Sequence, residues 1–255
     1  MSRLVVVTGA ASGIGRATAT AFAEDGASVV VVDVNREQAE KTAASLPDAE
    51  ARECDVRDPA AVEALAASLA RVPDVVVNNA GVGMTGRFAD MTIEDWEWIR
   101  SVNLDGVLNG CRTFGRAMLR RGSGHIVNVS SGLAYMPHAT EPAYVTTKAA
   151  VLAFSQCLRA DWRPQGVSVT VVCPGVINTP IIDATRFVGD QAATREKTAK
   201  AFRRGHKPEK VAADIVKGVR EDKAIVFSGF EARVGWWLHR LSPVAIGQLG
   251  ARVSV

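Results

Sequence analysis

The chain has 255 residues, of which 47% are hydrophobic and 22% are charged, and its formal net charge is +3. These values are typical of a globular protein with room for a sizeable core, and the small, scattered charge argues against a nucleic-acid partner. The four cysteines have no Cys-x-x-Cys spacing, which favours free thiols in a reducing, cytoplasmic compartment over disulfide bonds or a zinc site. No apolar run approaches the ~18 residues that a membrane-spanning helix needs.

The first element is a short β-branched run from Leu4 to Val7, which is typical of a buried strand and too short for a secretion signal. It leads into the glycine-rich turn Thr8–Gly15 and then into a helical stretch from Arg16 to Asp25, which Gly26 ends. A strand, a glycine turn and a helix in this order point backbone N–H groups at a phosphate. The spacing is Gly-x-x-x-Gly-x-Gly, and the usual dinucleotide-binding spacing is Gly-x-Gly-x-x-Gly. Taken alone, the glycines are therefore equally compatible with a phosphate-binding turn and with a tight turn that binds nothing.

The second strand runs from Ser28 to Val32 and ends in Asp33, 20 residues after Gly13. An acid at about this distance from the glycine turn binds the adenosine ribose in dinucleotide-binding folds. Its carboxylate would accept hydrogen bonds from both ribose hydroxyls and repel a 2′-phosphate, which favours NAD over NADP. Arg16 and Arg36 lie nearby in the sequence, and arginines can instead accommodate that phosphate.

Strands and helices alternate through the rest of the chain. Helices are predicted at 36–46, 59–71, 92–122, 144–162 and 208–220. A third strand is predicted to end near 54–56, and further strands are predicted at 74–77, 125–129, 167–172 and 224–227. The alternation predicts an α/β fold, a single-domain Rossmann-type doubly wound parallel sheet of about seven strands with helices on both faces, over residues 1–230. Residues 176–205 are polar and irregular, which is typical of a mobile lid.

Tyr144 and Lys148 are four residues apart, so they lie one turn apart on one face of their predicted helix. The lysine ammonium can there favour the ionised phenol, whose pKa is normally about 10. Such a pair also occurs by chance on solvated helix faces. Asn103 lies in the long helix that begins at a predicted capping box at Thr92. A polar amide among apolar neighbours is most often a hydrogen-bonded core residue, so Asn103 alone does not indicate a functional site.

Several short motifs occur together in this chain. In chain order they are the turn Thr8–Gly15, Asp33, Cys54-Asp55-Val56, Asn78-Asn79-Ala80-Gly81, Tyr144-x-x-x-Lys148 and Pro174-Gly175. This combination resembles the short-chain dehydrogenase/reductase family over roughly residues 3 to 228. In that family the motifs are, respectively, the cofactor turn, two adenosine contacts, the central sheet motif and two active-site motifs.

The resemblance implies four catalytic residues. Tyr144 would be the general acid/base, and Lys148 would lower the pKa of Tyr144 and hold the nicotinamide ribose. Ser131, chosen over Ser130, would bind the reacting oxygen, and Asn103 would hold a water in the proton relay. Metal is not required.

The resemblance also implies a nicotinamide cofactor, NAD in preference to NADP. The residues expected to bind it are Gly9, Ser12, Gly13, Ile14, Gly15, Asp33, Asp55, Val56, Asn79, Ala80, Gly81, Tyr144, Lys148, Pro174, Gly175, Ile177 and Thr179. The substrate pocket is expected near the lid and at Gly83, Met84, Leu133, Tyr135 and His138.

The expected function is the NAD(H)-dependent interconversion of a secondary alcohol and a ketone, with a hydrophobic substrate because most of these pocket residues are apolar. One alternative is an NADPH-dependent ketoreductase of biosynthesis. A second is a nucleotide-binding regulatory protein without catalysis, which would be expected to lack one of the four catalytic residues. A serine hydrolase using Ser131 and His138 lacks the Gly-x-Ser-x-Gly elbow.

Residues 231–255 extend beyond the family motifs. The segment from Glu231 to Leu241 is predicted as an amphipathic helix, with an apolar stripe and with Trp236 on the other side. The stripe consists of Val234, Trp237, Leu238 and Leu241. It is interpreted as packing on the protein's own body or a neighbouring subunit, or else as docking on a membrane through residues 231–252. The resemblance further implies a homodimer or homotetramer, with the Asn103 and Tyr144 helices at one interface.

Overall fold

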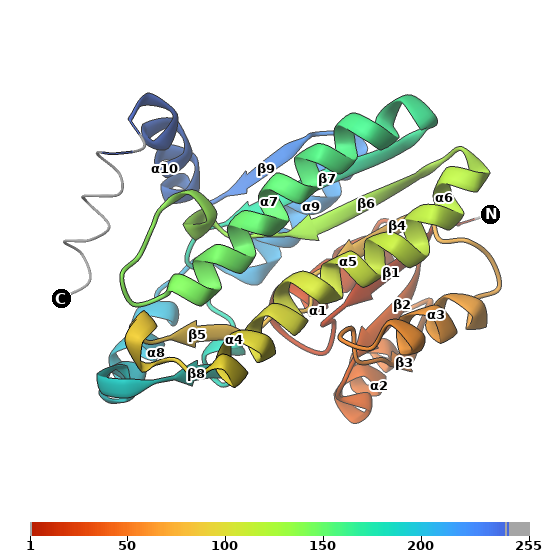
Figure 1. The fold of residues 1–255 in the computed structure, drawn as a ribbon. Coiled ribbons are helices and arrows are strands. Elements are labelled where there is room, and N and C mark those ends of the chain that lie inside the picture. The colour runs from red at the N-terminus through yellow and green to blue at the C-terminus, as the bar shows by residue number, and fades with distance from the viewer. Residues whose placement is uncertain (1, 243, 245–255) are drawn as a thin grey trace.

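The structure, a computed structural model, describes residues 2–242 and 244. Its centre is a seven-stranded parallel sheet in the order β3-β2-β1-β4-β6-β7-β9 (Figure 1). The strands are β1 (Leu4–Thr8), β2 (Ser28–Asp33), β3 (Ala49–Glu53), β4 (Val75–Asn78), β6 (Gly124–Val129), β7 (Val167–Pro174) and β9 (Ile225–Ser228). The predicted α/β fold with its doubly wound parallel sheet is confirmed.

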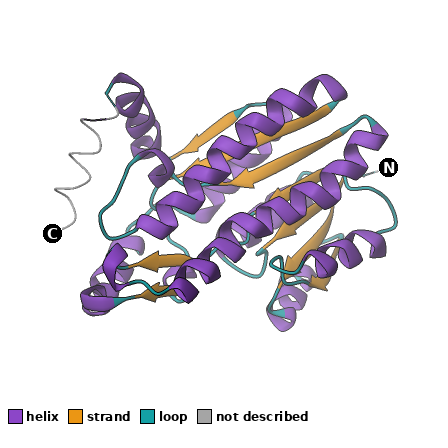
Figure 2. Ribbon diagram, viewed as in Figure 1, coloured by secondary structure: helices purple, strands orange, loops and turns teal. Residues whose placement is uncertain are grey.

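Helices cover both faces of the sheet (Figure 2). One layer contains α1 (Gly13–Glu24), α2 (Arg36–Ala44) and α9 (Pro208–Arg220). The other contains α3 (Pro59–Ser68), α7 (Pro142–Trp162) and one long helix made of α4 (Ile93–Arg100), a π-helical turn (Ser101–Asp105), α5 (Gly106–Gly110), a second π-helical turn (Cys111–Gly115) and α6 (Arg116–Arg121).

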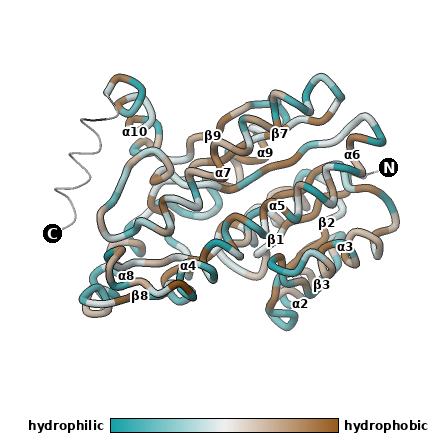
Figure 3. Tube along the Cα trace, in the orientation of Figure 1, coloured by the Kyte–Doolittle hydropathy of each residue, from teal (hydrophilic) through white to brown (hydrophobic). Residues whose placement is uncertain are grey.

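The strands are buried on both faces because their side chains alternate between the two layers. Val5 and Val7 of β1 belong to the core against α1, whereas Val6 belongs to the core on the opposite face. All three are fully buried. Figure 3 shows hydrophobic colour along β6, whereas α2 is mostly hydrophilic.

The long helix begins and ends where the sequence predicts. Thr92 is its N-cap: the Thr92 hydroxyl accepts a hydrogen bond from the Asp95 N–H, and the Asp95 carboxylate accepts one from the Thr92 N–H, both at 3.2 Å. This is a complete capping box. Gly122, with φ of 74°, ends the helix in the left-handed conformation. The two π-helical turns inside it are not signalled by the sequence.

The sheet order reverses between β1 and β4, because β2 lies on one side of this pair and β6 on the other. In doubly wound sheets, ligands bind at this switch point, outside the carboxyl ends of the strands. The glycine turn follows β1 and the Asn78–Gly81 motif follows β4, so the fold brings together two motifs that are about 70 residues apart in the sequence.

The segment 176–205 is not irregular, which corrects the prediction. It contains β8 (Thr185–Phe187), which pairs in parallel with β5 (Gly83–Thr85), and the helix α8 (Arg195–Phe202). Arg186 stacks on Trp98, with the guanidinium carbon 4.0 Å from the ring centroid. The segment therefore has regular elements that dock on the main body.

The C-terminal helix α10 (Phe230–Leu241) packs by the face opposite to the predicted stripe. Ala232 and Gly235 are buried, and the Trp236 ring lies 5.3 Å from the Tyr135 ring and 5.4 Å from the Phe227 ring. In the stripe, Trp237 is 59% and Leu241 81% exposed. The interpretation that this stripe packs on the protein's own body is therefore wrong, and its packing on a neighbouring subunit stays a prediction. Of the further residues up to 252, Pro243 and 245–252 lie outside the described residues.

Among the residues that the structure describes, no helix is both long and apolar enough to cross a membrane.

Candidate active site

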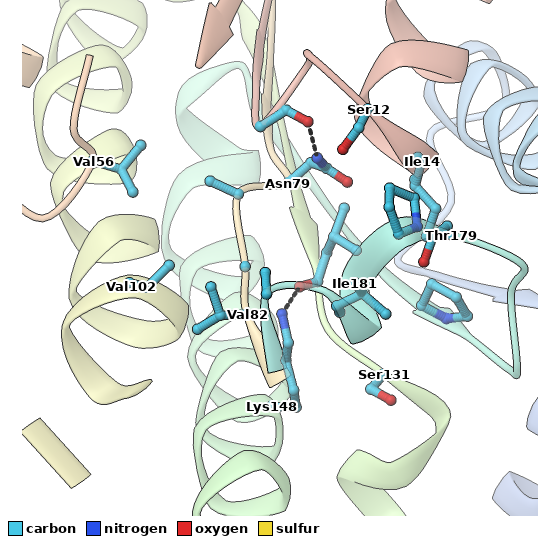
Figure 4. A pocket seen from close by; sticks show the side chains of 18 of the residues that line it. Ser12, Ile14, Val56, Asn79, Val82, Val102, Ser131, Lys148, Thr179 and Ile181 are labelled. Carbon is cyan, nitrogen blue, oxygen red and sulfur yellow. Dashed lines mark hydrogen bonds between the residues drawn. The ribbon is translucent and has the colours of Figure 1, made fainter. Parts of the chain in front are cut away.

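A cavity of about 450 Å³ opens at the switch point of the sheet (Figure 4). Its size is typical of a small-molecule site. The glycine turn and the loop after β4 form one part of its wall, the start of α7 and the loop after β6 another, and the loop after β7 with the lid a third.

The glycine turn packs closely against the loop after β4. A Cβ atom on Gly9 would lie 2.8 Å from the Ala80 Cα, and one on Gly15 would lie 2.1 Å from the Gly9 carbonyl oxygen. Gly9 also has a φ of +64°, which side chains disfavour. Only glycine fits this approach, and it leaves the backbone open toward the cavity.

The same contact is fixed by hydrogen bonds. The Thr8 hydroxyl accepts bonds from the N–H groups of Asn79 at 3.0 Å and Ala80 at 3.1 Å. The Asn79 amide donates to the carbonyls of Thr8 at 2.9 Å and Gly9 at 3.1 Å. Ser12, the N-cap of α1, makes no side-chain cap hydrogen bond, so the first N–H groups of α1 can hold a phosphate.

Asp33 stands at the far end of the glycine turn. Its two carboxylate oxygens accept hydrogen bonds from the N–H groups of Ala11 and Asn35, both at 3.0 Å. Each oxygen keeps a second lone pair for a ribose hydroxyl. The donor set, the open backbone and the carboxylate therefore fit an adenine dinucleotide.

The two arginines that lie near Asp33 in the sequence are not among the described residues that line the cavity. Arg36 pairs with Glu40 at 2.8 Å, and Arg16 is exposed on α1. Arg57 is the one arginine among the described residues that line the cavity, and it pairs with Asp55 at 2.6 Å.

The proposed catalytic side chains gather at the other end of the cavity. Lys148 is buried and donates a hydrogen bond to the Val129 carbonyl at 3.0 Å, and its nitrogen lies 5.9 Å from the Tyr144 ring centroid. The Ser131 hydroxyl accepts a hydrogen bond from the Leu133 N–H at 3.1 Å. The Ser130 hydroxyl donates to the Lys148 carbonyl at 2.6 Å, so it is the less available of the two serines.

Burial controls the protonation of this group. It raises the pKa of Tyr144 to about 12; a hydrogen bond with Ser131 lowers that pKa, and the charge of Glu141 raises it further. Burial also lowers the pKa of Lys148 to about 8. The predicted lowering of the Tyr144 pKa by Lys148 is not found in the chain by itself, where burial keeps Tyr144 protonated at neutral pH.

Asn103 is fully buried in the first π-helical turn of the long helix. Its amide exchanges two hydrogen bonds with the Val82 backbone, at 2.8 and 2.9 Å, and donates a longer one to the Thr147 hydroxyl at 3.4 Å. A π-helical turn is uncommon and is frequent at functional sites. Asn103 thus connects the long helix to the loop after β4 and to α7.

Most of the residues expected to bind the cofactor line the cavity. They are Gly9, Ser12, Gly13, Ile14, Asp33, Asp55, Val56, Asn79, Ala80, Gly81, Tyr144, Lys148, Pro174, Gly175, Ile177 and Thr179. Gly15 lies beneath the turn. Figure 4 shows Ser12 and Asn79 at the glycine end, and Ser131 and Lys148 at the catalytic end.

The five residues expected around the substrate are not among the described residues that line this cavity. Met84 is buried against Ile99 and Ala143, and Gly83 packs against Thr185. Tyr135 is buried and donates a hydrogen bond to the Ala232 carbonyl at 2.6 Å. Leu133 and His138 are partly buried near the start of α7. A role for these residues in substrate binding stays a prediction.

The cavity wall also contains residues that the sequence analysis did not identify. The main ones are Val34, Arg57, Val82, Trp98, Val102, Ile181, Ala184 and Phe202. Three of these belong to the lid, whose position could be predicted but whose individual contacts could not. Trp98 reaches the cavity from the long helix, and no local motif marks it.

Comparison with known proteins shows the family of this chain. A family model described as short chain dehydrogenase matches residues 3–187. The chain is 44% identical to the probable oxidoreductase EphD of Mycobacterium tuberculosis over 258 residues, which are 95% of the chain but only 44% of that protein. It is 38% identical over 187 residues to D-threitol dehydrogenase of Mycolicibacterium smegmatis, covering 70% of the chain and 72% of that protein.

Two solved structures are similar along most of the chain. A short-chain dehydrogenase/reductase from Burkholderia phymatum in complex with NAD has a TM-score of 0.88 and 27% identity, covering 96% of this chain and 95% of that chain. Serine dehydrogenase complexed with NADP+ has a TM-score of 0.77 and 28% identity, covering 85% and 88%. The chain therefore belongs to the short-chain dehydrogenase/reductase family of oxidoreductases.

Proposed function

We propose that this protein is an NAD(H)-dependent oxidoreductase that interconverts a secondary alcohol and a ketone. The observation that carries the proposal is one cavity with two chemically different ends. A glycine turn and the Asp33 carboxylate form one end, and Tyr144, Lys148 and Ser131 meet at the other. The relative named D-threitol dehydrogenase supports an alcohol substrate.

The proposed roles follow from the contacts of each side chain. Nicotinamide, when bound, supplies the hydride chemistry. Tyr144, held protonated by burial, donates a proton to the oxygen of a ketone, while the Ser131 hydroxyl orients that oxygen. In the reverse direction the phenol must first lose its proton, so alcohol oxidation should be favoured by higher pH. Positioned proton transfer of this kind contributes about 10²–10⁴-fold to the rate.

Asp33 is the basis for NAD rather than NADP. A 2′-phosphate on the adenosine ribose would lie beside a carboxylate, with no unpaired arginine among the described lining residues to compensate for it. Similar proteins bind NAD or NADP, which supports a nicotinamide cofactor in general.

The test is an activity screen over a panel of secondary alcohols and ketones with both cofactors, read by absorbance of the reduced cofactor. Apolar substrates should be preferred, because Val82, Trp98 and Ile181 are among the side chains that line the cavity. A protein that binds neither cofactor would contradict the proposal. A protein that binds a cofactor but turns over none of the panel would favour the alternative of a nucleotide-binding regulatory protein without catalysis.

We propose a homodimer or homotetramer in which the long helix and α7 form one interface. These helices lie side by side (Figure 1), and Leu104, Phe154 and Leu158 on them are only partly buried in the single chain. Light scattering that shows only monomer at micromolar concentration would refute this.

Membrane contact through the stripe of α10 stays a prediction. Trp237 and Leu241 are exposed, and Arg240 lies 6.0 Å from the Trp237 ring centroid, an arrangement that suits a lipid headgroup layer. Flotation with anionic liposomes should carry the full chain but not a chain that ends at Phe230. If neither floats, the membrane interpretation is wrong.

A further inference from the structure

The first turn of α10 places a carboxylate against the loop that follows β7. One oxygen of Glu231 accepts a hydrogen bond from the Val176 N–H at 3.1 Å. The other oxygen lies 3.1 Å from Nε2 of His206. Three segments that are distant in the sequence therefore meet at a single side chain.

The backbone on both sides leaves room for this carboxylate. A Cβ atom on Gly175 would lie 2.0 Å from the Glu231 oxygen, and one on Gly229 would lie 2.8 Å from it. Gly229 also has a φ of +105°, which favours glycine. The position of the carboxylate therefore requires glycine on both sides, because a Cβ at either residue would meet it.

The two partners of Glu231 are the two ends of the lid. The His206 N–H donates to the Val176 carbonyl at 2.9 Å, and the Asn178 N–H donates to the His206 carbonyl at 2.8 Å. These bonds close the base of the 176–205 segment. Glu231 bonds both ends at once, so it ties the closed base of the lid to α10.

The same loop forms the cavity wall. Pro174, Gly175 and Ile177 line the cavity, immediately next to the Val176 N–H that Glu231 holds. Under the family resemblance, this loop contacts the nicotinamide end of the cofactor. A shift of the Val176 backbone would move both neighbouring residues relative to the cofactor.

The helix that carries Glu231 is itself firmly held. The Ala232 carbonyl accepts a bond from the Tyr135 hydroxyl at 2.6 Å, and the Trp236 ring packs between Tyr135 and Phe227. The charge attraction to His206 adds little, because both side chains are about 40% exposed. The hydrogen bond to the Val176 N–H is the part that fixes the loop.

We propose that Glu231 is a positioning residue: it sets the Pro174–Ile177 loop at the nicotinamide end of the cleft and makes α10 a part of the cofactor site. The inference rests on the proposed function, because it requires a nicotinamide dinucleotide in the cavity. It assigns a role to a residue outside the family motifs.

The test compares binding of two ligands that differ only at the nicotinamide end. The dissociation constants of NADH and of ADP-ribose are measured by calorimetry for the wild-type protein and for Glu231→Ala and Glu231→Gln. Glu231→Ala should weaken NADH binding about tenfold and leave ADP-ribose binding within about twofold, because ADP-ribose does not reach the loop. Glu231→Gln keeps an oxygen acceptor for the Val176 N–H and should recover NADH binding to within about threefold of wild type.

Trp236→Leu is the matched control. It removes the ring contacts of Trp236 but keeps the Glu231 carboxylate and the Tyr135 hydrogen bond to Ala232 that holds the first turn of α10, so it should lower the melting temperature at least as much as Glu231→Ala while leaving the ratio of the two dissociation constants unchanged. The inference is overturned if Glu231→Ala leaves that ratio unchanged, or if Trp236→Leu changes it equally. A wild-type protein that binds neither NADH nor NADPH would instead overturn the proposed function, and the inference with it.

Discussion

The two ends of the cleft are built in different ways. At the dinucleotide end the main chain of the turn packs closely against the loop after β4: Gly9 and Gly15 allow the turn to touch Asn79 and Ala80, and hydrogen bonds of Thr8 and Asn79 fix the contact. At the catalytic end, side chains carry the chemistry, and their removal from water shifts the pKa values of Tyr144 and Lys148.

This difference determines which property, binding or turnover, a substitution at each end should remove. A backbone cradle depends on shape, so a single added methyl group can abolish binding without altering any titrating group. A proton donor depends on one oxygen atom, so its removal can abolish turnover and leave binding intact. Four substitutions separate the two ends, and each affects one property more than the other.

Tyr144→Phe should have the largest effect. The ring and its packing remain, but the proton donor is lost, so kcat should fall by about 10²–10⁴-fold. The dissociation constant of NADH should stay within about twofold of wild type, because the glycine end is untouched. Steady-state kinetics and calorimetry measure both. Substantial remaining activity would show that Tyr144 is not the acid/base.

Gly9→Ala tests the other end against a control of equal backbone strain. Gly9 and Gly122 have φ values of +64° and +74°, but a Cβ on Gly9 would meet Ala80, whereas one on Gly122 would meet nothing within 4 Å. Both variants should lose similar stability from strain. Only Gly9→Ala should also weaken NADH binding, by at least about tenfold, or about 1.4 kcal/mol. Equal loss of binding in both variants would show that strain, not close packing, explains the effect.

Asp33→Asn should change the choice of cofactor more than the affinity for NADH. Placing two like charges together costs several kcal/mol, so the wild-type protein should bind NADH at least about tenfold more tightly than NADPH. The neutral amide should bring the two dissociation constants close together. Wild-type protein that binds NADPH as tightly as NADH would refute the role of Asp33.

The same contrast explains what the sequence could predict. The glycine turn, Asp33 and Asn79 are local motifs at the ends of strongly patterned strands, and strands and helices alternate clearly, so the sheet and the dinucleotide end follow from short stretches of sequence. Tyr144 and Lys148 are marked by their spacing and by family resemblance.

The remaining parts depend on contacts between distant segments. β5 and β8 are three residues each and pair across about 100 positions, so no local pattern marks them. The face of α10 that packs was predicted incorrectly, because Trp236 finds the Tyr135 and Phe227 rings while the more regular apolar stripe stays exposed. Amphipathic periodicity identified the helix but not its partner. The role of Glu231 could not be predicted from the sequence either, because its partners are 25 and 55 residues away.

Glu141→Gln should have the smallest effect on activity of the four substitutions, and the size of its effect on stability depends on pH. Glu141 is the N-cap of α7, three residues before Tyr144, and its side chain makes no cap hydrogen bond. Burial raises the pKa of its carboxyl from 4.5 to about 7. Below pH 4.5 the folded and unfolded states both hold the proton, so ionisation costs nothing. Between pH 4.5 and 7 the unfolded state loses the proton first, and stability falls as pH rises.

Well above pH 7 the wild-type protein bears the full cost of a charged, largely buried carboxylate, roughly 3 kcal/mol. Glutamine does not ionise, so the variant should melt several degrees higher than wild type at pH 8, and the gap should shrink toward pH 4.5. Because the charge of Glu141 also raises the pKa of Tyr144, the variant should reach its maximal alcohol-oxidation rate at a lower pH than wild type. Thermal melts and pH–rate profiles of the two proteins measure these effects. A melting-temperature gap that is independent of pH would mean that the carboxylate is already solvated, and that the catalytic end is less enclosed than its buried side chains indicate.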